Sequence, residues 1–147
     1  MSREIKYRVW DNQEKTYSDK AFSIDQLGIC YVQDEDGYWE EIDDSRFIVE
    51  FNTGLTDKNG KEIYEGDIVE WVNGLGEKHI FEIVWNECRA SFQMVEIGQE
   101  YPYILQGLSD KMKPYCEVIG NIHKPPKNFR PEHLKRMGVT MVKGGEE

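Results

Sequence analysis

Short apolar segments separated by glycine-containing turns are the feature that most restricts how this chain can fold. Apolar and polar residues alternate at residues 5–10, 47–51, 68–72 and 79–85, with no long helical period between them. Such alternation places successive side chains on opposite faces of a strand. Many short strands of this kind are typical of a small barrel or a sandwich. The sequence therefore predicts a mainly β fold.

The turn signals are strongest where glycine follows Asp or Asn. Asp36-Gly37 and Asn59-Gly60 predict hairpins with primed turns, in which successive residues take positive φ. Asn52-Thr53-Gly54 is expected to end the strand at residues 47–51. Gly66, between Glu65 and Asp67, is expected to permit a bulge or a close approach of two backbones.

The remaining elements are less uniform. Strands are expected at residues 29–32, 38–42, 92–96, 101–105 and 117–123, whereas residues 22–27 fit neither period. Pro125 and Pro126 end the last strand because proline cannot donate to a ladder. Residues 131–137 are compatible with a short C-terminal helix stopped by Gly138, and equally with a disordered tail.

Three segments differ in charge, and we expect them to be structurally distinct. Residues 1–50 carry 6 basic and 13 acidic side chains, and residues 51–124 carry 7 basic and 12 acidic side chains. Residues 125–147 carry 5 basic and 3 acidic side chains, so this tail could dock on an acidic surface of its own chain or of a neighbour.

The overall charge narrows the classes of partner. A net charge of -10 and a pI near 4.8 argue against binding nucleic acid through its phosphates, which requires clustered Lys and Arg. The negative charge also disfavours binding to an anionic membrane surface, which would repel the protein. There is no apolar run of about 20 residues and no signal-peptide pattern, so we expect a cytoplasmic protein. Cys30, Cys88 and Cys116 are widely spaced and are expected to be reduced thiols.

Three motifs stand out along the chain: REIKYRVWD near the N-terminus, TGLTDKNGKEIYEGDIVEW in the centre and EVIGNIH near residue 120. Their order and spacing resemble those of the YopX family, which is encoded largely by phages and prophages of Gram-positive bacteria. The resemblance implies a β-rich protein with an N-terminal subdomain at residues 1–50 that can mediate association and an SH3-like barrel at residues 51–124. It implies no activity and no site residues, and it does not extend past Pro126.

Candidate chemical sites are few. The turns at residues 34–37 and 57–60 suggest calcium loops, but neither has the glycine sixth and the Glu twelfth that an EF-hand requires. Glu65 and Asp67 could act as paired carboxylates, although capping a turn is the commoner role of such residues. His79, His123 and His133 lack metal-ligand spacing. We therefore expect no catalytic, cofactor-binding or metal-binding residues and no cofactor.

The aromatic residues are expected to serve the core and interfaces. They lie among acids rather than among the basic residues of a nucleotide-stacking groove, and the main ones are Tyr7, Trp10, Trp39, Trp71, Trp85 and Tyr101.

These observations favour a non-enzymatic phage accessory protein that self-associates, as a homo-oligomer, and binds a host or phage protein. One alternative is an acidic DNA mimic that inhibits a host DNA-binding protein, based on the acids of residues 34–44. Another is an uncharacterised hydrolase that uses Glu65 and Asp67.

Overall fold

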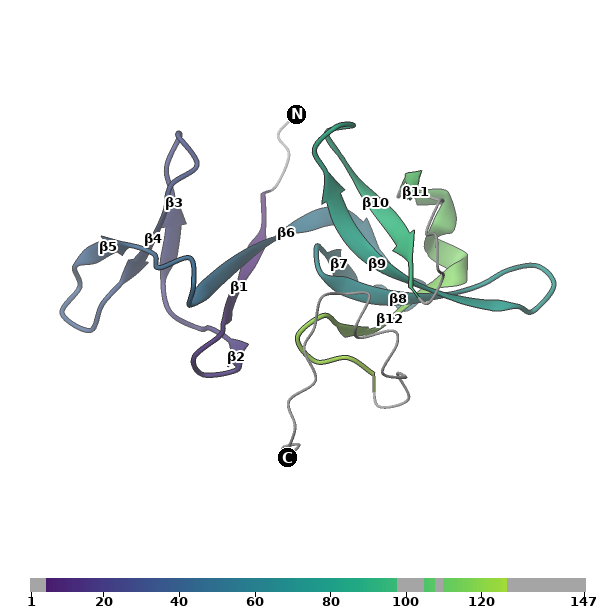
Figure 1. The fold of residues 1–147 in the computed structure, drawn as a ribbon, viewed down its shortest axis with the longest axis horizontal. Helices are drawn as coiled ribbons and strands as arrows, with labels where there is room; N and C mark the ends of the chain where they lie inside the picture. The colour runs from purple at the N-terminus through teal and green to yellow at the C-terminus, as the bar shows by residue number, and fades with distance from the viewer. Residues whose placement is uncertain (1–4, 98–104, 108–109, 127–147) are drawn as a thin grey trace. The chain divides into compact units, whose positions relative to one another are not determined.

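The chain divides into two compact units, which are described separately. The computed structural model describes residues 5–97, 105–107 and 110–126 (Figure 1). One unit is Ile5–Phe51, and the other contains the described residues from Asn52 onward. Strands dominate both units, so the predicted mainly β fold is confirmed. The division into segments 1–50, 51–124 and 125–147 stays a prediction.

The N-terminal unit contains two small antiparallel sheets. In one, β1 lies between β2 and β6, and in the other β4 lies between β3 and β5. The strands are β1 (Tyr7–Asp11), β2 (Thr16–Tyr17), β3 (Phe22–Ile24), β4 (Cys30–Gln33), β5 (Trp39–Glu41) and β6 (Phe47–Thr56). The stretch that fitted neither period thus contains a short strand, β3.

Charged groups replace part of an apolar core in this unit. The Asp11 carboxylate is 2% exposed and accepts hydrogen bonds from Arg46 Nε and Nη2 at 3.0 and 2.9 Å. These bonds lower the pKa of Asp11 to about 2. Glu50, also 2% exposed, accepts from Arg8 Nε at 2.8 Å and from the Tyr17 hydroxyl at 3.0 Å. Buried carboxylates need such partners to offset the loss of hydration.

The apolar core of the N-terminal unit is small. Phe22 of β3 packs edge-on against Phe47 of β6, with ring centroids 5.5 Å apart. The buried apolar residues of this unit are Val9, Trp10, Cys30 and Phe47.

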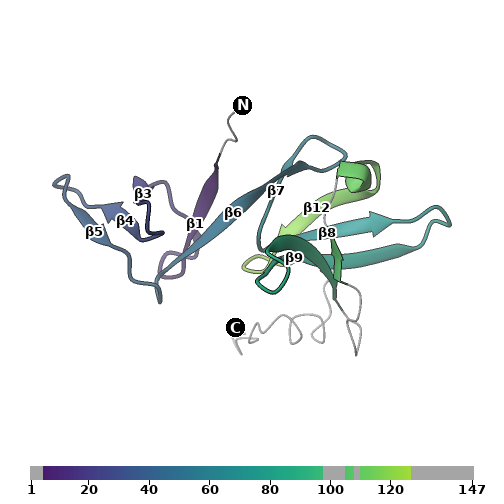
Figure 2. The same ribbon diagram turned by 90° about the horizontal axis from the view of Figure 1, so that it is seen from above.

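The C-terminal unit is a curled half-barrel. Its sheet has the order β11-β10-β9-β8-β12, and Figure 2 shows the bend of β9. The elements are β7 (Glu62–Tyr64), β8 (Asp67–Val72), β9 (Lys78–Asn86), β10 (Ser91–Glu96), β11 (Leu105–Gly107), the 3₁₀ helix η1 (Asp110–Tyr115) and β12 (Cys116–Asn121).

The core of this unit is continuous and apolar. It is formed by Ile63, Val69, Phe81, Ile83, Met94, Met112 and Cys116, with Trp71 and Val118 packed against it. Burial, followed by the nearby Asp57 carboxylate, raises the pKa of the Cys116 thiol to about 11, so this thiol stays protonated.

Four turns share one construction that the expected primed turns do not have. In each, an Asp or Asn side chain accepts the N–H groups two and four residues later, and a glycine at the fourth position has positive φ. The turns begin at Asp25, Asp34, Asp57 and Asn73. The primed-turn prediction was wrong, because no described residue directly before these glycines has positive φ. The pattern (D/N)-x-x-G encodes this turn.

The predicted strand end at residues 52–54 was wrong, because β6 runs to Thr56. Gly54 lies where the register of the β6–β7 pairing shifts, between Asn52 and Thr56. Gly54 has φ +87, and its N–H donates to the Asn52 side-chain oxygen at 2.6 Å.

The predicted helix at residues 131–137 lies outside the described residues. Among the described residues, we find no helix with the length and hydropathy needed to cross a membrane.

Candidate protein-binding surface

The β4–β5 hairpin concentrates acidic and aromatic side chains on one exposed element. Residues 34–44 contain seven acidic side chains and no basic one. Tyr38 is 70% exposed and Trp39 is 48% exposed. Large aromatic residues are enriched in protein interfaces, where they bury much area at little cost in conformational entropy. We call the exposed residues 35–41 the acidic hairpin.

The outer edge of β5 is unpaired in the described part of the chain. Figure 1 shows β5 beside β4, with no strand on its other side. Asp34 N–H donates to the Tyr38 carbonyl at 2.8 Å, so Asp34 and Tyr38 form a hydrogen-bonded pair at the end of the β4–β5 ladder. Because ladder bonds alternate along an antiparallel pair, the N–H and C=O groups of Trp39 and Glu41 point away from β4. An exposed edge of this kind is a template for an additional strand.

A groove lies next to this hairpin, within the N-terminal unit. It has a volume of about 430 Å³ and is lined by Gly28, Ile29, Cys30, Glu41, Ile42, Asp44, Ile48 and Val49. This volume is within the range of about 300–1,000 Å³ that is usual for ligand pockets. Apolar side chains therefore share the groove with two exposed carboxylates.

The thiol in the groove is unsuited to nucleophilic chemistry. Cys30 is 8% exposed, and burial raises its pKa, with a further increase from the charge of Asp44. A thiolate is the reactive form of cysteine, so these surroundings suppress reactivity.

One backbone position in the groove, Val49, has no hydrogen-bond partner among the residues that the structure describes. Asn12 N–H donates to the Arg46 carbonyl at 2.7 Å, and Ser18 N–H donates to the Val9 carbonyl at 2.8 Å. Given the register that places Val9 opposite Val49, the N–H and C=O of Val49 must point away from β1. No group in the described part of the chain bonds to them.

The carboxylates proposed for hydrolysis lie in a turn of the C-terminal unit. Asp67 is 2% exposed, and its Oδ2 accepts the Tyr64 N–H at 2.8 Å. Gly66, between Glu65 and Asp67, has φ +87, and its N–H donates to the Ile83 carbonyl at 2.9 Å. The bulge or close backbone approach expected at this glycine stays a prediction.

Metal sites are absent from the part of the chain that the structure describes. No group of three His, Cys, Asp or Glu residues there could hold a metal ion. His79 Nδ1 of β9 lies 2.8 Å from Glu96 Oε2 of the neighbouring strand β10. The calcium-like turns are explained by their own hydrogen bonds, and His133 lies outside the described residues.

The aromatic residues divide between the core and the surface. Trp10 is 2% exposed, whereas Trp39 and Trp85 are 48% and 45% exposed. Trp71 packs against Phe81, with ring centroids 5.9 Å apart. Tyr101 lies outside the described residues.

The acids were visible in the sequence, whereas the groove was not. Its lining comes from the β3–β4 turn, β4, β5, the β5–β6 loop and β6, and no local pattern specifies that combination. The (D/N)-x-x-G repeat is a local signal that could have identified all four turns.

The fold defines a mainly β protein made of two small units. The chain belongs to the YopX protein family, whose model matches residues 6–129. This agrees with the resemblance found in the sequence.

Two solved structures are similar in fold. A crystal structure of protein EF1440 from Enterococcus faecalis is 24% identical, with a TM-score of 0.51, and the match covers 86% of this chain and 98% of that one. A crystal structure of protein yopX from Bacillus subtilis is 20% identical, with a TM-score of 0.53 and coverage of 84% and 97%. No curated protein matches.

Proposed function

We propose that this chain is a protein-binding module without catalytic activity, and that the acidic hairpin is its binding surface. The observation that carries the proposal is the unpaired edge of β5, which presents Tyr38 and Trp39 among acids. Strand addition supplies affinity through main-chain hydrogen bonds, and the neighbouring side chains supply specificity. The acids favour a basic partner and accelerate its association.

Self-association is a separate part of the proposal. Apolar side chains outside residues 35–41 are exposed on the N-terminal unit, including Ile5 at 73% and Leu27 at 79%. Pairing β5 with its own copy would bring like charges together, because Glu40 and Glu41 make up most of the strand. We therefore assign self-association to exposed apolar side chains such as these. Light scattering over a range of concentrations tests it, and a strict monomer at high concentration would contradict it.

The biological setting follows from the family resemblance. We propose an accessory role for the protein in a phage or prophage, exercised in the cytoplasm of the bacterial host. The absence of a membrane-spanning helix among the described residues is compatible with this setting.

DNA mimicry is the second candidate, supported by the seven acids of residues 34–44. Strand geometry weakens it, because Glu40 and Glu41 are consecutive and so project to opposite faces of β5. A mimic needs its charges in rows on one surface. Hydrolysis by Glu65 and Asp67 ranks third, because the Asp67 carboxylate already accepts a turn N–H.

Affinity purification from host cells tests the leading proposal. We expect a co-purifying protein to be lost from the Trp39→Ala variant and kept by the Trp85→Ala variant. Trp85 is a matched control, because it is 45% exposed in the other unit. Equal recovery with both variants would contradict the proposal, and recovery of a DNA-binding protein that is insensitive to Trp39→Ala would favour the mimic.

A further inference from the structure

The groove between β6 and the β4–β5 hairpin has three properties that together indicate a ligand. It has apolar walls, it has two carboxylates, and it contains the main-chain N–H and C=O of Val49, which have no partner among the described residues. Water can hydrate these groups in the open groove, and a bound chain can replace that water with its own hydrogen bonds. An extended polypeptide satisfies both groups at once, as in strand addition.

The β6 edge is available for such an addition. β7 pairs with β6 only from Asn52 onward, so the preceding part of β6 has β1 on one side and no strand of the described residues on the other. Val49 lies in the middle of this part. A segment that pairs with Val49 would run through the groove.

The side chains of the groove specify what this segment carries. The aliphatic walls come from Ile42, Ile48 and Val49, and the carboxylates come from Glu41 and Asp44. Lys and Arg combine an apolar stem with a cationic end, so they can pack the stem on such walls and place the charge beside carboxylates. An acidic or purely apolar side chain would leave the carboxylates uncompensated.

We propose that this groove binds an extended, basic segment of another protein. The segment pairs with the backbone of Val49 and places a Lys or Arg side chain between Glu41 and Asp44. The inference rests on the proposed function and deepens it by naming the chemistry of the partner. It also adds a second binding edge beside that of β5.

Amide hydrogen exchange of the full chain with a synthetic peptide provides the test. The probe is an acetylated Lys-Val-Lys-Val-Lys-Val-Lys peptide, and the control is the same peptide with Glu in place of Lys. We expect the basic peptide to slow exchange of the Val49 amide and the acidic peptide to leave it unchanged. We also expect the affinity to fall as salt is added.

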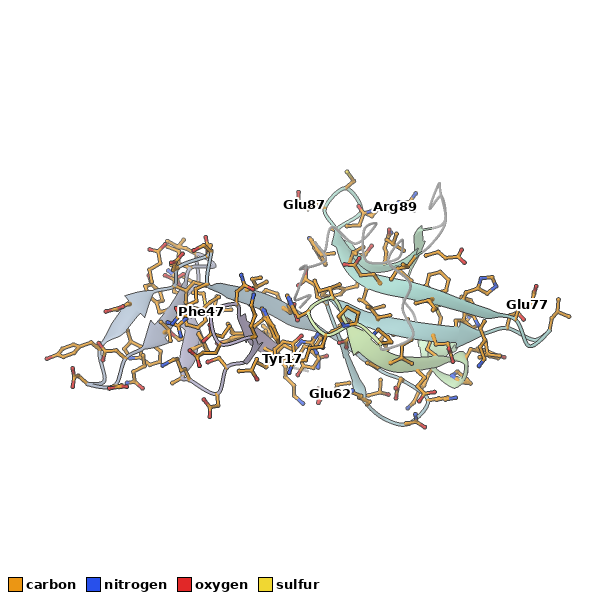
Figure 3. The ribbon with its side chains drawn as sticks, turned by 60° about the horizontal axis from the view of Figure 1, so that its bottom comes forward. Tyr17, Phe47, Glu62, Glu77, Glu87 and Arg89 are labelled. Carbon is orange, nitrogen blue, oxygen red and sulfur yellow. The ribbon has the colours of Figure 1, made fainter. Side chains whose placement is uncertain are left out.

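Substitutions assign the effect to the groove. Glu41→Lys combined with Asp44→Lys should weaken the basic peptide by about tenfold or more. Glu14→Lys combined with Glu87→Lys makes the same change in net charge at exposed positions outside the groove and should change affinity little. Glu87 lies in the turn between β9 and β10 (Figure 3). Val49→Pro removes the N–H, which faces the free edge, and should abolish binding while the fold is kept.

Four results would overturn the inference. The first is an unchanged exchange rate of the Val49 amide with the basic peptide. The affinity purification with Trp39→Ala would then still test the proposed function separately. Protection of the Trp39 and Glu41 amides alone would move the site to β5. Equal weakening by both pairs of charge reversals would reduce the effect to net charge. Stronger protection of Val49 by a peptide of residues 125–147 would make the occupant the tail of this chain or of another copy.

Discussion

The turns at residues 34–37 and 57–60 have the same hydrogen-bonded construction and opposite surroundings. In both, Asp Oδ1 accepts the N–H groups two and four residues later. Asp57 is only 1% exposed, and its Oδ2 also accepts the Val118 N–H of β12 at 2.9 Å. The Asp34 turn instead carries the exposed acids of the hairpin.

The comparison shows that a local code can fix a turn without fixing its role. The second carboxylate oxygen makes the difference, because at Asp57 it joins the turn to a strand 61 residues away. Lys58 N–H strengthens the same junction by donating to the Cys116 carbonyl at 3.0 Å. The first turn remains a surface element that is available for binding, and the second is part of the barrel.

Replacing the two aspartates should give the largest contrast. Asp57→Asn places an amide N–H₂ or a neutral oxygen where a carboxylate accepted three N–H groups, so we expect a loss of about 2 kcal/mol in the free energy of unfolding. Asp34→Asn should cost less than about 0.5 kcal/mol. Hydrogen exchange of the amides of the C-terminal unit, Val118 included, measures the loss caused by Asp57→Asn. Hydrogen exchange of the amides of the N-terminal unit measures the loss caused by Asp34→Asn. Equal costs would mean that the contact with β12 contributes nothing.

The contribution of the Asp57 carboxylate to stability should depend on pH. Burial raises the pKa of Asp57, but the N–H donors of Val118, Lys61 and Asn59 outweigh it, so the pKa is lowered. A carboxyl whose folded-state pKa is lowered stabilises the fold above its unfolded pKa of about 4, and this contribution is lost as pH falls through the folded pKa. The stability difference between wild type and Asp57→Asn should therefore shrink on acidification. A difference that is constant from pH 7 to pH 2 would contradict this.

Alanine at the turn glycines should have equal effects in both turns. Gly37 and Gly60 have φ of +91 and +82, and a Cβ would meet no atom closer than 3.8 Å. The cost is therefore the backbone strain alone, about 1 kcal/mol for each. Thermal unfolding monitored separately for each unit measures it. A much larger loss at Gly60 would indicate that the packing of that turn, rather than its backbone, limits the substitution.

Trp39→Ala should have the smallest effect on stability. The side chain is 48% exposed on an edge strand, so we expect a change within about 0.5 kcal/mol. Urea denaturation of the purified variant checks this. A large loss would assign Trp39 to folding and would undermine its use as a test of binding.

The sequence predicted most strands because their side chains alternate locally. β8 and β9, for example, lie within one or two residues of the expected runs. It failed at residues 52–54, where Asn52 and Gly54 accommodate an irregularity inside β6, because tertiary pairing with β7 overrides the local turn signal. The same limit applies to the candidate site. The acids and Trp39 were visible in the sequence, whereas the groove depends on which edge of β6 stays unpaired around Val49.

Site-specific photo-crosslinking at position 39 tests most directly whether the acidic hairpin is a binding surface. The protein would carry a photoreactive phenylalanine at Trp39, or at Leu75 as a control, which is 86% exposed in the other unit. In host cells we expect a discrete crosslinked protein from position 39 and none from position 75. The same crosslinks from both positions, or none from position 39 under conditions where the partner co-purifies, would contradict the proposed role of the hairpin.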